Sequence, residues 1–158
     1  MKTEQRILKH IGQVFLKKHY SLAVAESVTA GLLQFKLSNI PDASKFFQGG
    51  ITAFNIAQKF KHLNVEPSHA IAVNCVSQKV AEEMATNVAR VFNSSWSIGI
   101  TGYASPAPES DGKLFAYFAI CQDGKVKRAG KISSKEIDPP LVQEKYALFV
   151  LGRLAELV

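Results

Sequence analysis

Apolar residues recur every three or four positions in five segments of the chain, a spacing that predicts amphipathic helices. These segments are residues 3–19, 27–39, 56–63, 77–92 and 138–158. Short apolar runs typical of buried strands occupy residues 22–25, 51–55 and 96–101, and Asp123-Gly124 predicts a hairpin between strands at 113–122 and 125–133. This order predicts an α/β fold, a three-layer α/β/α arrangement with a mixed central sheet, in one domain over residues 1–158.

The same spacing predicts which side of two helices is buried. Ser77 is suited to cap the helix that follows it, and the buried face of that helix is expected to hold Val80, Met84, Val88 and Val91. The buried side of the final helix is expected to hold Leu141, Leu148, Leu151, Ala155 and Val158. The loop around Pro67 is expected to close off the helix at 56–63, and the long loop at 102–112 is expected to be functional or mobile.

Composition and charge narrow the class of protein. The 158 residues are 47% hydrophobic and 20% charged, which is ordinary for a globular chain and unlike disordered or membrane proteins. No unbroken apolar run occurs near the N-terminus, so we expect no signal peptide, no membrane partner and a cytoplasmic location. The net charge of +6 is scattered, and its densest stretch, residues 125–135, has no interleaved aromatic side chains to stack bases. Nucleic acid is therefore not expected as a partner.

The two cysteines give no pattern for a metal or a disulfide framework. Cys75 and Cys121 stand alone, with no CxxC motif and no histidine at ligand spacing. We expect both to be reduced, buried side chains and expect no metal site. The glycines also lack the spacing of a Walker or dinucleotide-binding motif.

Ligands in such folds bind where strands end and helices begin, which directs attention to residues 25–31 and 101–106. Ser27 follows a strand, so its hydroxyl could cap the expected helix or attack a carbonyl carbon, with helix amides stabilising the oxyanion that forms. Such a serine needs a base, and the four histidines have no evident tie to the strand ends. Lys59 is the remaining candidate if burial lowers its pKa. The alternative is an ordinary exposed helix lysine.

Further residues at this edge of the sheet offer contacts for a small ligand. Thr29 and Thr101 supply hydroxyl groups. A glycine lets the backbone approach a ligand closely, and four glycines fall in these segments: Gly31, Gly49, Gly50 and Gly102. Each is a weak signal alone.

Several motifs occur in a fixed order between about residues 22 and 106. They are Ala25-Glu26-Ser27-x-Thr29-x-Gly31, Pro41-x-Ala43-Ser44, Phe47-x-Gly49-Gly50 with Lys59, Val76-Ser77 with Ala81, Met84 and Ala85, and Thr101-Gly102-x-Ala104-x-Pro106. At these spacings the chain resembles the CinA C-terminal domain family, whose members include nicotinamide mononucleotide deamidases. The separate N-terminal domain of two-domain members has no counterpart in these residues, so we expect the stand-alone form.

The resemblance implies a homo-oligomer with an α/β/α fold that hydrolyses a small-molecule substrate, nicotinamide mononucleotide, to nicotinate mononucleotide and ammonia. It implies no metal and no other cofactor. Ser27 would be the nucleophile, Lys59 its base, and the amides after Ser27 would hold the oxyanion. The resemblance places substrate contacts at Glu26, Thr29, Gly31, Gly49, Gly50, Phe54, Thr101 and Gly102.

The chain departs from the family pattern at several positions. Phe54 stands where the family carries a tyrosine, so one hydroxyl is missing. Val28, Ala30 and Ser105 replace smaller or different family residues, Glu109 and Asp111 add negative charge near the expected phosphate, and only Lys135 stands where members carry arginines. Two hypotheses follow. One is a Ser/Lys amidohydrolase of weak or altered activity, and the other is a catalytically inactive paralogue that acts as a small-ligand-binding or regulatory module.

Overall fold

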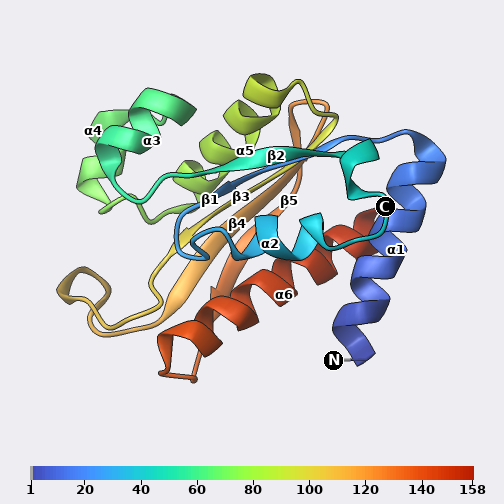
Figure 1. Ribbon diagram of the computed structural model, residues 1–158. Helices are drawn as coiled ribbons and strands as arrows, with labels where there is room; N and C mark the ends of the chain where they lie inside the picture. The colour runs from blue at the N-terminus through green and yellow to red at the C-terminus, as the bar shows by residue number, and fades with distance from the viewer. Residues whose placement is uncertain (1) are drawn as a thin grey trace.

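A five-stranded mixed sheet forms the centre of the molecule in the computed structural model, which describes residues 2–158 (Figure 1). Its strands are β1 (Leu22–Glu26), β2 (Phe47–Thr52), β3 (Trp96–Gly102), β4 (Phe115–Gln122) and β5 (Lys125–Ser133). The spatial order is β2-β1-β3-β4-β5, with β1 parallel to β2 and β3, and β4 antiparallel to both of its neighbours. The predicted α/β fold with a mixed sheet is confirmed.

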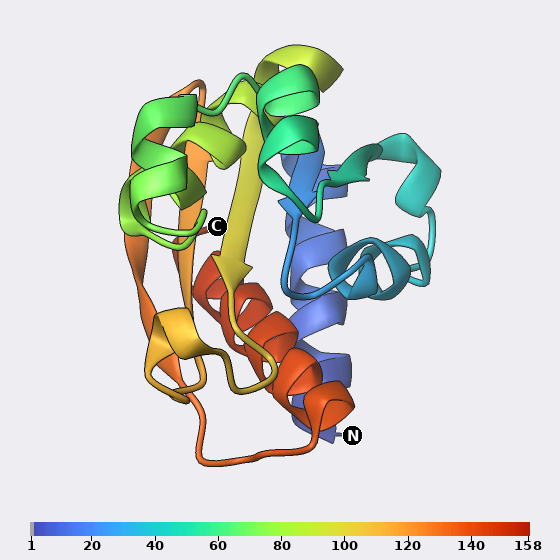
Figure 2. The ribbon, with the colours of Figure 1, turned by 90° about the vertical axis from the view of Figure 1, so that its left-hand side faces the viewer.

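Helices cover both faces of this sheet. One face carries α1 (Lys2–Lys18), α2 (Leu32–Ser38) and α6 (Pro139–Leu157), and the other carries α3 (Ile56–Leu63), α4 (Pro67–Ala72) and α5 (Gln78–Phe92) (Figure 1). Short 3-10 helices occur at Ala43–Lys45 and Pro108–Ser110. Side chains of β1 alternate between the two cores, since Leu22 and Val24 pack on the first and Ala23 and Ala25 on the second. Figure 2 looks onto the edge of the sheet at which β1, β2 and β3 end.

Two predicted boundaries are wrong near this edge. The expected helix at 27–39 begins only at Leu32, because Ala30 and Gly31 have φ angles of +50° and +96° and cannot continue a right-handed helix. The expected strand at 51–55 instead runs over Phe47–Thr52, where it pairs with all of β1. Residues 27–31 therefore form a turn, which leaves the Ser27 side chain outside any helix.

The segment after Leu63 was predicted as a loop and contains the helix α4. Glu66 caps it by accepting hydrogen bonds from the N–H groups of Ser68 and His69. Pro67 occupies the first helical position, where its missing N–H costs nothing. Pro67 therefore begins the helix α4, whereas the sequence analysis expected only a loop here that ends the helix at 56–63.

Two predicted buried faces need correction. On α5 the structure buries Val80, Met84 and Val88 as expected, but Val91 is exposed. On α6 only Leu151 of the predicted set is buried, and the packed side holds Val142, Tyr146, Ala147, Val150, Leu151 and Leu154. This helix is apolar around most of its circumference, so spacing alone does not select one side.

The structure also bears on the expectations about the two cysteines and about membrane-spanning helices. Cys121 is buried as predicted, whereas Cys75 is only partly buried, and both thiols are free. Among residues 2–158, no helix has the length and apolar character needed to cross a bilayer.

Candidate active site

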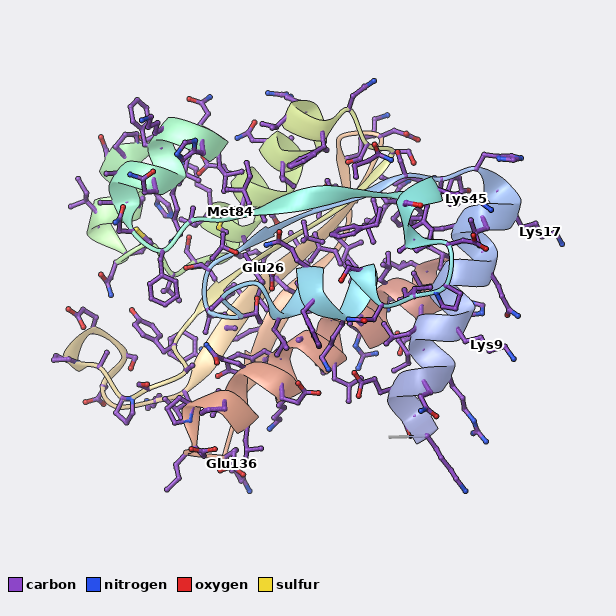
Figure 3. All side chains as sticks on the ribbon, viewed as in Figure 1. Lys9, Lys17, Glu26, Lys45, Met84 and Glu136 are labelled. Atoms are coloured by element: carbon purple, nitrogen blue, oxygen red, sulfur yellow. The ribbon has the colours of Figure 1, made fainter. Side chains whose placement is uncertain are left out.

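Ser27 lies directly after the central strand β1. Its N–H donates to the Ile100 carbonyl of β3 at 3.1 Å, which fixes the end of β1 against its neighbour. The helix-capping interpretation of Ser27 is wrong, because α2 begins five residues later. Glu26 performs that task, since its carboxylate accepts hydrogen bonds from the Leu33 and Gln34 N–H groups at 2.7 and 3.1 Å (Figure 3). The Ser27 hydroxyl is left for another partner.

That partner is Lys59, in the first half of α3. Asn55 caps this helix by accepting a hydrogen bond from the Gln58 N–H at 3.0 Å, and the helix directs Lys59 toward the end of β1. Lys59 Nζ lies 2.9 Å from Ser27 Oγ and 3.0 Å from the Ala53 carbonyl oxygen. Only 1% of the Lys59 side chain is exposed. The alternative of an ordinary exposed lysine is therefore wrong.

The surroundings of Lys59 favour its neutral amine. Burial lowers the pKa of Lys59, and the nearby Cys75 thiol opposes this with a smaller effect. Burial also raises the pKa of the Cys75 thiol, so this thiol is a weak source of compensating charge. A neutral Lys59 can donate one N–H to the Ala53 carbonyl and accept the Ser27 O–H on its lone pair. The pair has the geometry of a nucleophile with its general base.

The dyad opens into a cavity of about 500 Å³ at the carboxyl ends of the parallel strands. Residues from the ends of β1, β2 and β3, the start of α3, the turn after α4 and the start of α6 line it: Ser27, Val28, Phe54, Asn55, Ile56, Lys59, Asn74, Cys75, Val76, Thr101, Gly102, Tyr103, Ala104, Ser105, Pro139 and Gln143. Within residues 2–158, the Val28 N–H donates no hydrogen bond. It adjoins Ser27 and is suited to hold an oxyanion.

Three of the predicted contact residues line this cavity. Phe54 lies at its wall with 68% of its side chain exposed, and Thr101 and Gly102 follow from β3. The Thr101 hydroxyl donates to the Cys75 carbonyl at 2.7 Å, which holds the turn after α4 against β3. A Cβ on Gly102 would lie 2.6 Å from Ala116 Cβ, so this glycine is required by the packing of β4.

The other five predicted contact residues do not line the cavity. Hydrogen bonds, backbone conformation and close packing explain why these residue types stand there. The Thr29 hydroxyl donates to Glu26 at 2.7 Å, so both stabilise the turn and the start of α2. Gly31 and Gly49 have φ angles of +96° and +129°, which favour glycine. A Cβ on Gly50 would lie 2.7 Å from the Val24 side chain. These residues shape the scaffold under the dyad.

The sequence analysis missed the polar residues Asn55, Asn74 and Gln143, and it singled out residues 101–106 without assigning a contact to Tyr103. Asn74 and Tyr103 come from separate segments and meet through a 3.1 Å hydrogen bond from Asn74 Nδ2 to the Tyr103 hydroxyl. Gln143 comes from α6, more than a hundred residues beyond Ser27, and no spacing in the sequence indicates this approach. No group of three or more His, Cys, Asp or Glu side chains suited to a metal ion occurs in the described part of the chain.

Comparison with known proteins agrees with this architecture. The family model described as the CinA C-terminal domain matches residues 4–158. A putative competence-damage inducible protein of Moorella thermoacetica is 41% identical over 118 residues, and a CinA-like protein of Trichodesmium erythraeum is 36% identical over 110 residues. These matches cover 73% and 70% of this chain but only 28% and 26% of the relatives, so the chain spans about a quarter of their length.

Solved structures give the same result. A CinA superfamily protein from Escherichia coli superposes with a TM-score of 0.91 at 29% identity, covering 98% of this chain and 90% of that protein. A competence or damage-inducible protein from Enterobacter asburiae superposes with a TM-score of 0.88 at 26% identity, covering 95% and 94%. The match of the family model to residues 4–158 and these similarities lead to one conclusion: the chain belongs to the CinA C-terminal domain family.

Proposed function

We propose that the protein is an amidohydrolase that converts nicotinamide mononucleotide to nicotinate mononucleotide and ammonia. The observation that carries the proposal is the 2.9 Å contact between Ser27 Oγ and the buried amine of Lys59, whose pKa is lowered by burial. A serine with an adjacent neutral amine is a nucleophile able to attack a carboxamide. The reaction needs only water besides the substrate.

The proposed reaction has two halves. In the first, Ser27 Oγ attacks the carboxamide carbon while Lys59 accepts the hydroxyl proton, and the Val28 N–H stabilises the oxyanion. Lys59 then donates this proton to the departing nitrogen, which leaves as ammonia and gives an ester on Ser27. In the second half, Lys59 takes a proton from water, the hydroxide attacks the ester, and the acid is released as Ser27 regains its proton.

The experiment that tests the proposal is the measurement of ammonia released from nicotinamide mononucleotide by wild-type protein and by Ser27→Ala. We expect Ser27→Ala to lower kcat at least ~1,000-fold without unfolding the protein. Ser94→Ala is the matched control, because it also removes a buried serine hydroxyl. Ser94 lies just before the start of β3, whereas the cavity lies where β3 ends. Equal release by wild type and Ser27→Ala would contradict the proposal.

A second candidate function is a non-catalytic module that binds a small ligand. Phe54 favours it, because a phenyl ring at the cavity wall supplies no hydroxyl, whereas the resemblance to the family implies a tyrosine at this position. The fold and cavity would persist without turnover. This candidate predicts that folded wild-type protein at high concentration releases no ammonia, while binding the ligand as tightly as Ser27→Ala does.

The homo-oligomer and the small-molecule partner implied by the resemblance remain predictions. Size-exclusion chromatography with light scattering measures the first directly, and the ammonia assay addresses the second. The cytoplasmic location also remains a prediction from the sequence.

A further inference from the structure

Away from the dyad, the cavity offers neutral polar groups. The carboxamides of Asn55, Asn74 and Gln143 all line it. Asn55 accepts one hydrogen bond, and Asn74 and Gln143 each donate one, so every carboxamide keeps donors or acceptors for a ligand. The Ser105 hydroxyl lies at the same wall and is exposed. Such groups suit the hydroxyls of a sugar.

Two aromatic side chains line the same cavity. Phe54 follows β2 and is 68% exposed, and Tyr103 follows β3 and is partly buried. The faces of such rings carry negative potential and attract a cation that lies over them. A pyridinium ring combines a flat shape with a positive charge. The aromatic residues therefore suit an N-substituted pyridinium carboxamide.

The charges around the cavity do not suit a phosphate. Lys59 is the one lysine or arginine among the described residues that line it, and its amine already contacts Ser27 and the Ala53 carbonyl. The helix α6 begins beside the cavity with Pro139 and Pro140, which lack the N–H groups that bind anions at a helix N-terminus. The residue before them, Asp138, carries a carboxylate and no cation. A dianionic phosphate would lose water here and gain no cationic partner.

We infer that the site prefers an N-ribosylated pyridinium carboxamide without a phosphate over the corresponding mononucleotide. This inference rests on the proposed function, because it concerns the substrate of the same dyad. The carboxamide would lie at Ser27, the ring near Phe54 and Tyr103, and the ribose hydroxyls near the free groups of the carboxamides. The positive ring also favours the neutral form of Lys59, since like charges repel.

The test compares ammonia release from nicotinamide riboside and from nicotinamide mononucleotide under identical conditions. We expect kcat/KM for the riboside to exceed that for the mononucleotide. A kcat/KM for the mononucleotide that equals or exceeds that for the riboside would overturn the inference and leave the amidohydrolase proposal intact. No release from either compound would count against the amidohydrolase proposal itself.

Binding decides the inference even if turnover is absent. Calorimetry with Ser27→Ala measures dissociation constants for the riboside, the mononucleotide and inorganic phosphate. We expect the riboside to bind more tightly than the mononucleotide and inorganic phosphate to displace neither. Equal or tighter binding of the mononucleotide, displacement by inorganic phosphate, or no binding of either nucleoside compound would overturn the inference.

Discussion

Two buried lysines in this molecule have opposite surroundings. Exposed lysines such as Lys9 and Lys17 point away from the ribbon (Figure 3), but Lys36 and Lys59 are only 7% and 1% exposed. Lys36 lies among α1, α2 and α6, where its Nζ contacts Glu4 at 2.5 Å and Glu144 at 2.6 Å. Lys59 donates hydrogen bonds to a hydroxyl and a carbonyl oxygen. Within residues 2–158, Lys36 forms ion pairs with two carboxylates and Lys59 forms none.

This difference reverses the shift of the pKa. Burial opposes the charge of Lys36, but hydrogen bonds and attraction from Glu144 and Glu4 outweigh it, so the pKa of Lys36 is raised. Burial dominates at Lys59 and its pKa is lowered. Lys36 therefore stays cationic and joins three helices, whereas the neutral form of Lys59 is favoured, as its proposed role as a base requires. In this molecule, burial lowers the pKa of the lysine that contacts a hydroxyl and a carbonyl oxygen, and two carboxylates reverse that effect at the other lysine.

The largest expected effect comes from Lys59→Met, which removes the amine and keeps the side-chain volume. We expect kcat for ammonia release to fall at least ~1,000-fold, because Ser27 loses its proton acceptor. The free energy of unfolding should stay level or rise by about 1 kcal/mol, since an apolar group replaces a buried amine. Ammonia assays and urea unfolding measure the two effects. Lys45→Met, at an exposed lysine, is the control for both. Turnover within threefold of wild type in folded Lys59→Met would exclude Lys59 as the base.

Lys36→Met should lower the stability of the protein and leave its turnover nearly unchanged, the reverse of Lys59→Met. It leaves Glu4 and Glu144 close together without their cation, and we expect the protein to lose about 2 kcal/mol of stability. The loss is moderate because the two carboxylate side chains are 24% and 41% exposed and retain contact with water. kcat should stay within twofold of wild type. Urea unfolding measures the stability, and a variant as stable as wild type would show that the ion pairs contribute nothing net.

The sequence indicated a role for Lys59 and none for Lys36. Ser27 and Lys59 stand in motifs with family spacing. Ser27 follows a predicted strand and Lys59 lies in the predicted helix that follows the next one, so their meeting could be anticipated. The sequence analysis did not single out Lys36, because its partners Glu4 and Glu144 lie 32 and 108 residues away. Only the packing of three helices brings these charges together, and apolar spacing carries no information about it.

In the fold, too, local sequence patterns predicted some elements, whereas features that depend on tertiary packing were missed. Strong periodicity predicted α1, α3 and α5 closely, and the Asp123-Gly124 turn predicted the hairpin β4–β5. The turn at residues 27–31 was missed because left-handed angles at Ala30 depend on Glu26 and on the neighbouring strands. The α6 face was missed because that helix is apolar almost all round. Of the site, the dyad and three cavity residues were predicted, while Asn74 and Gln143 reach it only through tertiary packing.

The contributions of Lys59 and Lys36 to the free energy of unfolding should change with pH in opposite directions. Between the lowered pKa of folded Lys59 and the ordinary value of 10.5, the unfolded chain binds more protons at this residue than the folded chain does. Wild-type stability should therefore rise with pH in this window relative to Lys59→Met. Lys36 has a raised pKa, so its stabilisation is complete below 10.5 and is lost as pH rises through the folded-state value. Urea unfolding over a pH series measures both differences, and parallel curves for wild type and Lys59→Met would contradict the lowered pKa.

Phe54→Tyr has the smallest expected effect and tests whether Lys59 acts alone in proton transfer. Phe54 lines the cavity with most of its ring exposed, so an added hydroxyl meets no steric barrier and can donate near the reacting carboxamide. We expect kcat to rise a few-fold, with unchanged stability. Phe60→Tyr is the matched control, because Phe60 is an exposed aromatic residue on α3 that does not line the cavity. A rise shared by both variants, or none in Phe54→Tyr, would mean that the missing hydroxyl does not limit turnover and that the buried amine of Lys59 alone sets the rate of proton transfer.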